Sequence, residues 1–154
     1  MEFQVITSYF QSIQQAKKEY TRILEPVCTR YSLTRSEIDI LLFLLNNPEL
    51  DRAADIVKCR GIAKSHVSLS VGTLEEKGLL CRRESTSDRR TVHLMLCDSG
   101  LKIALEAQIL QKEFFRHIFA GLTTEEMALW RRITEKVSAN IQNMEIAQTI
   151  QINE

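Results

Sequence analysis

The sequence predicts a mainly α-helical fold with one small β-hairpin. The 154 residues include only five Gly and two Pro, and apolar residues recur at intervals of three and four over long stretches, which is typical of amphipathic helices. Two short runs, 79–84 and 91–96, are strand-like, and every other residue from Val92 to Leu96 is branched and apolar. The polar segment 85–90 between these runs fits a hairpin turn.

Two helices are expected in the first part of the chain. A stripe of apolar residues from Val5 to Val27 predicts a long amphipathic helix. Pro26 should kink or stop this helix, because its ring removes a backbone donor and clashes with the preceding turn. Thr34 and Glu37 have the spacing of a capping box, and they open a second, very apolar helix that we expect to form the core.

A helix-turn-helix is expected before the hairpin. Asp51 can cap a short helix, and residues 59–61 make a turn. The next helix runs from Lys64 to Lys77, and Gly78 is its left-handed C-terminal cap. A helix followed by a hairpin with a basic tip is the layout of a winged helix-turn-helix, which places the helix in the DNA major groove and an arginine of the hairpin in the minor groove.

Two more helices complete the predicted order. Asp98 can cap a long helix, and Thr123 with Glu126 has the capping-box spacing at the start of the last one, in which Trp130 is expected in the core.

The long terminal helices carry more apolar surface than a small winged helix can cover, and such a surplus is usually a dimer interface. We therefore expect one domain, 1–154, with a winged helix-turn-helix unit at 33–97 and a helical dimerisation region at 1–30 and 98–146.

Charge is unevenly distributed along the chain. The net charge is zero, but the segment from Arg52 to His93 holds nine Lys or Arg against five Asp or Glu. The middle of the chain therefore carries an excess of four positive charges, and the remainder an equal negative excess. A basic middle with acidic flanks favours a local nucleic-acid contact.

Several classes of function are disfavoured by the sequence. No apolar run approaches the roughly 18–20 residues of a membrane span, and the N-terminus lacks the pattern of a signal peptide, so we expect a cytoplasmic protein. We find no nucleophile–base–acid set, phosphate loop or metal-ligand spacing, and expect neither an enzyme nor a cofactor or metal. The four cysteines form no C-x-x-C pair and are expected to be free thiols, most of them buried: Cys28, Cys59, Cys81 and Cys97.

A rotation of 100° per residue separates two faces of the predicted recognition helix. The face expected to pack on the domain holds Val67, Val71, Leu74 and Gly78. The opposite face and its shoulders hold mostly short side chains: Ser65, His66, Ser68, Leu69, Gly72, Thr73 and Glu76. We expect Leu69 to contact a thymine methyl group and His66 or Ser68 to donate to a purine N7. Thr73 is a further candidate for DNA contact.

Phosphate contacts are expected beside this helix. Arg60, Lys64 and Ser65 lie at or before its N-terminus, where free backbone amides already favour an anion. In the hairpin turn, either Arg89 or Arg90 should enter the minor groove, and Asp88 should pair with the other arginine.

Five segments in order carry a family resemblance: Leu33-Thr34-x-x-Glu37, Lys64–Ser68, Leu74–Leu79, Asp88–Arg90 and Gly121–Glu126. Together they resemble the MarR family of bacterial transcriptional regulators, over nearly the whole chain. The resemblance implies a homodimer that binds double-stranded DNA at a pseudo-palindromic operator, as a ligand- or stress-responsive repressor. It also implies an effector that alters the spacing of the two DNA-binding heads.

Other interpretations of the sequence stay open. Tyr9, Tyr20 and Tyr31 are candidates for lining a small-molecule cavity, although core or dimer contacts are the commoner role of such residues. The chain could instead be a winged-helix protein-interaction module without a DNA target. It could also be a cysteine-based redox sensor on the same fold, with Cys28 reactive only if its pKa is lowered.

Overall fold

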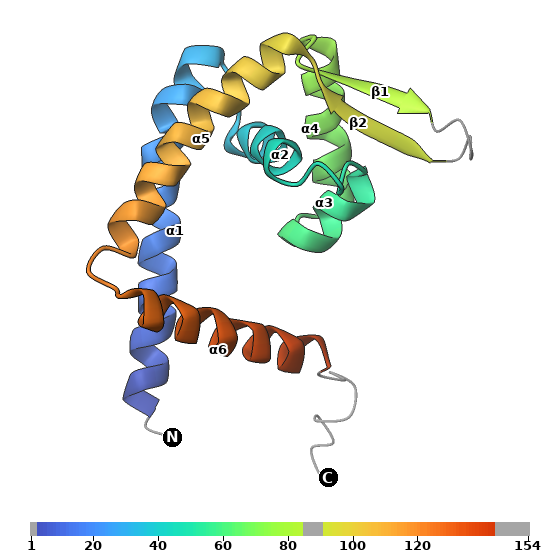
Figure 1. The fold of residues 1–154 in the computed structure, drawn as a ribbon. Helices are drawn as coiled ribbons and strands as arrows, with labels where there is room; N and C mark the ends of the chain where they lie inside the picture. The colour runs from blue at the N-terminus through green and yellow to red at the C-terminus, as the bar shows by residue number, and fades with distance from the viewer. Residues whose placement is uncertain (1–2, 85–90, 144–154) are drawn as a thin grey trace, which may run out of the picture. The chain divides into compact units, whose positions relative to one another are not determined.

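The computed structural model describes residues 3–84 and 91–143 (Figure 1). The elements follow in the order α1 (Phe3–Tyr31), α2 (Arg35–Asn46), α3 (Ala53–Arg60), α4 (Lys64–Glu76), β1 (Leu80–Glu84), β2 (Val92–Leu96), α5 (Asp98–Ile118) and α6 (Thr124–Gln142). The predicted mainly helical fold with a small β-wing is confirmed. The chain divides into two compact units, with the boundary between Arg116 and His117 in the last turn of α5.

The core of the first unit forms around α2. Four of its side chains, Ile38, Ile40, Leu41 and Leu42, are completely buried, as expected for so apolar a helix. The predicted capping box is present, because the Thr34 hydroxyl accepts from the Glu37 amide and the Glu37 carboxylate accepts from the Thr34 amide at 2.7 Å. This pairing lets Glu37 stay buried without an unsatisfied charge.

Pro26 does not end α1, in contrast to one of the predicted outcomes. The helix continues to Tyr31, and Ser32 then closes it in a left-handed conformation with φ 51°. Leu24 and Val27 on either side of the proline are buried in the core. Their packing stabilises the helical path and offsets the loss of one backbone hydrogen bond.

The two strands form an antiparallel hairpin in which Leu80 pairs with Leu96 and Glu84 with Val92. Of the alternating branched residues of β2, Leu94 is buried, Leu96 is half-buried and Val92 is 36% exposed. The hairpin extends away from the helices toward its tip (Figure 1), so the core covers only its base.

Asp51 ties the hairpin to α3 instead of capping that helix as predicted. Its carbonyl oxygen accepts from the Leu94 amide at 2.7 Å, and its carboxylate lies 2.7 Å from Nδ1 of His93. The N-cap of α3 is Arg52, whose amide donates to the carboxylate of Asp55. Pairing with β2 therefore takes Asp51 out of the capping position.

The start of α5 also differs from the prediction by one residue. Asp98 is the first helical residue, and the Leu101 amide donates to the carbonyl of Cys97 at 2.8 Å. The Cys97 amide is bonded to the Leu79 carbonyl at the base of the hairpin. Cys97 therefore joins the hairpin to α5. Its amide bonds to the base of the hairpin, and its carbonyl accepts the first hydrogen bond of the helix.

The second unit consists of the end of α5, a short loop and α6. Thr123 and Glu126 form the predicted capping box. Trp130 was expected in the core, but it is 47% exposed and packs edge-on against Phe119 at 5.0 Å between ring centroids. One helix and a loop contain too little chain to cover an apolar stripe.

The cysteines are free but none is buried: Cys28 and Cys97 are half-buried, and Cys59 and Cys81 are exposed. The expectation that most are buried is therefore wrong, since two of them lie on solvent-facing positions of α3 and β1. Within residues 3–84 and 91–143, no helix is long and apolar enough to cross a bilayer. In the same part of the chain, no group of three potential ligands could hold a metal ion.

Candidate nucleic-acid interface

Helix α4 has the two predicted faces, except that Gly78, which was expected on the packed face, is exposed and lies beyond the end of the helix. Val67, Val71 and Leu74 are at most 2% exposed, and they fix the helix against the core. On the opposite side Leu69 is 71% exposed, and Ser65, His66 and Ser68 are exposed beside it. The helix therefore presents one large apolar side chain among small polar ones.

The C-terminal half of this face is less open than its N-terminal half. Gly72 and Thr73 are half-buried, and the Thr73 hydroxyl donates to the Leu69 carbonyl at 3.2 Å. The helix then ends at the left-handed Gly78, and the Lys77 ammonium donates to the carbonyl of Ser32 at 2.7 Å. The C-terminal end of α4 is therefore tied to the residue that follows α1.

The N-terminus of α4 is open to an anion. The N-cap residue, Ala63, has no side chain that can accept from the first-turn amides. Lys64 and Ser65 follow it at exposed positions. Unpaired amides, the positive end of the helix dipole and a lysine together attract phosphate.

Arg60 has a partner of its own within the protein. Its Nη2 lies 3.1 Å from a carboxylate oxygen of Asp39, and its side chain is 33% exposed. The residue is the last of α3, and Gly61 with φ 62° turns the chain toward α4. Arg60 therefore stands beside the start of the recognition helix, with one of its N–H groups already engaged.

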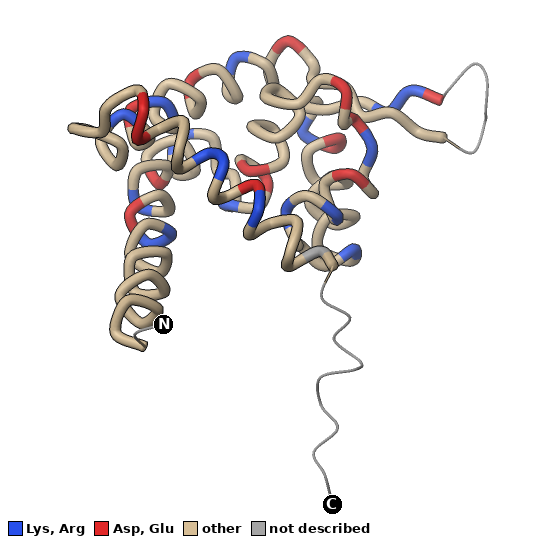
Figure 2. Tube along the Cα trace, turned by 60° about the horizontal axis from the view of Figure 1, so that its bottom comes forward, with Lys and Arg blue, Asp and Glu red and all other residues tan. Residues whose placement is uncertain are grey.

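The hairpin contributes two arginines that the analysis of the sequence did not single out. Arg82 and Arg83 lie on β1, and Nε of Arg82 is 3.2 Å from the carboxylate of Glu75 on α4. Figure 2 marks the basic positions of the hairpin and of the helices near it. The excess of basic residues between Arg52 and His93 includes both arginines, but it does not predict which of them lies against α4.

The three wing residues predicted to act at the minor groove, Asp88, Arg89 and Arg90, lie outside the described residues.

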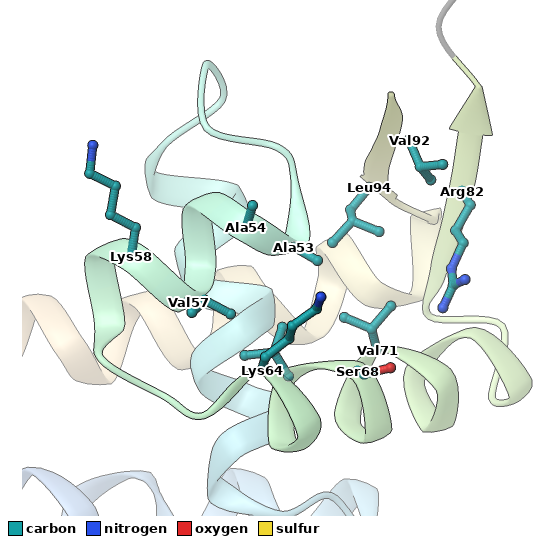
Figure 3. A pocket seen from close by; sticks show the side chains of 11 residues that line it. Ala53, Ala54, Val57, Lys58, Lys64, Ser68, Val71, Arg82, Val92 and Leu94 are labelled. Carbon is teal, nitrogen blue, oxygen red and sulfur yellow. The ribbon is translucent and has the colours of Figure 1, made fainter. Parts of the chain in front are cut away.

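A cavity of about 440 Å³ lies between α3, α4 and the hairpin (Figure 3). Its walls are mostly apolar and include Val57, Val67, Val71 and Leu94. Lys64 and Arg82 extend into the space between the helices and the strands, and Lys58 also lines the cavity although its ammonium end points away from the strands. The site thus joins an apolar interior with cationic groups, and Lys64 and Ser68 belong both to it and to the exposed side of α4.

The three tyrosines do not line this cavity, and they occupy different environments on α1. Tyr9 is 59% exposed. Tyr20 packs on Phe114 at 5.0 Å and its hydroxyl accepts from Gln111 at 2.6 Å. Burial raises the pKa of Tyr20.

Tyr31 donates a hydrogen bond to Glu106 of α5 at 2.7 Å, and this bond raises its pKa. Two of the tyrosines therefore link α1 to α5.

The two half-buried thiols, Cys28 and Cys97, carry no sign of activation. Burial raises the pKa of Cys28, and burial followed by the contact with Cys81 raises the pKa of Cys97. A raised pKa lowers the thiolate fraction, which is the reactive species. These environments disfavour Cys28 as a peroxide sensor.

Comparison with known proteins places these features in a family. A model of the MarR family matches residues 31–91, which cover α2, α3, α4 and β1 and end before β2. The uncharacterized HTH-type transcriptional regulator YdgJ of Bacillus subtilis is 25% identical over 118 residues, which are 77% of this chain and 70% of that protein. The transcriptional repressor MprA of Escherichia coli is 29% identical over 85 residues, 55% of this chain and 48% of that protein.

Solved structures share the fold at low sequence identity. The Staphylococcus aureus MepR–DNA complex has a TM-score of 0.71 at 20% identity and covers 88% of this chain and 95% of that one. Bordetella bronchiseptica BpsR, described for the regulation of its DNA binding by 6-hydroxynicotinic acid, has a TM-score of 0.62 at 21% identity, with 85% and 98% covered. Residues 31–91, which hold the helix-turn-helix and the first strand of the wing, therefore belong to the MarR family, and the relatives that the chain resembles are transcriptional regulators and repressors.

Proposed function

We propose that this regulator is a homodimeric repressor that binds a pseudo-palindromic operator through α4 and the wing. The observation that carries the proposal is the exposed face of α4, where Leu69 is surrounded by small polar side chains and Lys64 stands at the helix N-terminus. Small side chains let a helix approach base edges closely, and exposed cations beside it neutralise phosphates.

The contacts divide by chemistry. Leu69 contacts a thymine methyl group, and His66, Ser68 and Thr73 reach base edges. Lys64, Ser65 and Arg60 contact phosphate and set the position of the helix.

Arg89 or Arg90 enters the minor groove, with Asp88 holding the other arginine. These wing contacts rest on the sequence and on the shared family.

The dimer uses helices outside the winged helix-turn-helix unit, 33–97. Large apolar side chains stay exposed on α1, α5 and α6, among them Phe10, Ile109, Phe115 and Ile133, each more than 40% exposed. Segments 1–30 and 98–146 therefore form the dimerisation region of a single domain, 1–154. Light scattering should give twice the 17.7 kDa of one chain, and a stable monomer at micromolar concentration would refute the dimer.

The proposed target places the protein in the cytoplasm, where the DNA lies. The DNA tested is the intergenic segment beside the protein's own gene, searched for an inverted repeat. We expect tight binding by fluorescence anisotropy and a steep decrease of affinity with salt, because phosphate contacts release counterions. No binding to this duplex or to random duplex would favour a protein-interaction module instead.

A small apolar anion is the proposed effector, and the cavity between α3, α4 and the hairpin is its proposed site. Apolar walls suit a ring or a short chain, and Lys64 with Arg82 suits its negative group. Because Lys64 and Ser68 serve both surfaces, an occupied cavity would compete directly with DNA. The regulation of BpsR by 6-hydroxynicotinic acid shows that a relative in fold responds to such a molecule.

The competing proposal, from the sequence, places the effector at Tyr9, Tyr20 and Tyr31. Benzoate and 6-hydroxynicotinic acid are titrated into the protein–operator complex. We expect Val57→Phe, which fills the cavity, to abolish release of DNA, and Tyr20→Phe with Tyr31→Phe to leave it unchanged. The reverse pattern would assign the effector to the tyrosines.

A further inference from the structure

Asp39 in α2 binds two arginines through one oxygen atom. Nη2 of Arg35 and Nη2 of Arg60 each lie 3.1 Å from its Oδ1. The Asp39 side chain is only 18% exposed. Partial burial makes these charge-assisted hydrogen bonds stronger than those of an exposed pair.

Arg35 extends this contact to the long helices. Its Nη1 donates to the Tyr20 carbonyl at 3.3 Å, and its guanidinium carbon lies 4.4 Å from the centroid of the Tyr20 ring. This distance is within the range of a cation–π interaction. Since the Tyr20 hydroxyl accepts from Gln111, the network reaches α1 and α5.

Arg60 connects Asp39 to the segment that precedes α4. It is the last residue of α3, and three residues separate it from the first residue of α4. No side chain caps the N-terminus of α4, so the ion pair of Arg60 with Asp39 anchors the short connection that leads into that helix. The third of the Arg60 side chain that stays exposed leaves donors for a phosphate, because a guanidinium has five N–H groups.

We infer that Asp39 is a positioning residue for DNA binding, which acts by holding Arg60 at the start of the recognition helix. The inference rests on the proposed function and deepens it. Asp39 does not itself contact DNA, because a carboxylate repels phosphate. It connects the helices proposed for dimerisation with the helix proposed to read the operator.

The direction in which Asp39→Asn changes the affinity for DNA distinguishes a positioning role from an effect of charge alone. Asp39→Asn removes a negative charge near the DNA face, and by charge alone it should tighten binding to any duplex. It also leaves two guanidinium groups facing each other without their shared carboxylate. If Asp39 positions Arg60, operator binding becomes weaker although the protein becomes more positive.

The experiment measures operator and random-duplex affinity by anisotropy over a range of salt concentrations. The proteins are the full-length wild type, Asp39→Asn, Arg60→Ala and the double variant. We expect Asp39→Asn to bind the operator roughly two- to thirtyfold more weakly, the range for substitutions in a coupling network. In the Arg60→Ala background the same substitution should have less than about a twofold effect, because the two residues act as a unit.

Glu19→Gln is the matched control. Glu19 lies on α1 and pairs with Arg22 at 2.8 Å, so the substitution also removes one negative charge and one ion pair within a helix. We expect its operator affinity to equal that of the wild type or to rise slightly. A loss as large as that of Asp39→Asn would show that breaking any ion pair within a helix weakens binding, and it would overturn the inference.

Two other results of this experiment would also overturn it. These are unchanged or tighter operator binding by Asp39→Asn, and an equal loss in the presence and absence of Arg60. If thermal melts show that Asp39→Asn does not fold, Asp39→Glu replaces it, since it keeps the charge on a longer side chain. Weaker operator binding by Asp39→Glu supports positioning, and unchanged binding refutes it. A wild-type protein that binds no duplex would instead refute the proposed function as a whole.

Discussion

Gly100, in the first turn of α5, packs directly on the backbone of Leu79, and a Cβ atom at Gly100 would lie 1.9 Å from the Leu79 carbonyl oxygen. The same oxygen accepts from the Cys97 amide at 3.1 Å. Three elements therefore meet at the Leu79 peptide group: the turn after α4, the base of the hairpin and the first turn of α5.

Gly100→Ala should destabilise the protein, because the group that a methyl would meet is backbone and cannot rotate away. We expect a loss of about 1–3 kcal/mol in the free energy of unfolding, the usual cost of overpacking, measured by urea titration. Gly72→Ala is the control, since a Cβ atom there has no neighbour within 4 Å, and it should gain up to about 1 kcal/mol from helix propensity. Equal stability of the two variants would contradict the close approach.

Leu69→Ala should reduce sequence discrimination without changing stability. Leu69 is 71% exposed, so truncation opens no cavity. The loss should be roughly 1 kcal/mol at one base pair per half-site, a modest value for one apolar contact with a thymine methyl. The wild type should bind less tightly when uracil replaces thymine, and Leu69→Ala should be indifferent to that replacement. A wild type that ignores the missing methyl groups would assign recognition to His66 and Ser68.

Cys28 should react more slowly than Cys59. Burial raises the pKa of the Cys28 thiol, and a smaller thiolate fraction means slower alkylation, whereas Cys59 is exposed. Iodoacetamide labelling followed by mass spectrometry should show Cys59 modified first, and the Cys28 rate should rise steeply as pH is raised above neutrality. Preferential oxidation of Cys28 by peroxide would revive the redox-sensor alternative.

Asp55 should contribute to stability in a pH-dependent way. The hydrogen bond from the Arg52 side chain is the main cause that lowers the pKa of this carboxyl. The contribution is present above the ordinary carboxyl pKa of about 3.9 and is lost as pH falls through the lowered folded-state value. Urea titrations of the wild type and Asp55→Asn should therefore differ at pH 6 and converge toward pH 3. A difference that does not depend on pH would contradict the ion pair.

The sequence by itself determined the features that depend on neighbours along the chain. The capping boxes at Thr34 and Thr123 formed as their spacing predicts, because both partners lie within one helical turn. The buried and exposed faces of α4 followed from helical geometry alone, with Val67 and Val71 inside and Leu69 outside. The order of helices and hairpin was also readable, since periodicity and turn residues are local signals.

Contacts between distant segments were decided only by the tertiary structure. Asp51 is a residue type that commonly caps a helix, yet its carboxylate pairs with His93 of β2. Pro26 stays helical because its neighbours Leu24 and Val27 are buried. Nothing in the spacing of Asp39 and Arg60, 21 residues apart, shows that they pair. The cavity beside α4 likewise needs walls from α3 and β2. Such partners are chosen by the packing of the whole core, in which burial of apolar surface outweighs the local preference of a single side chain.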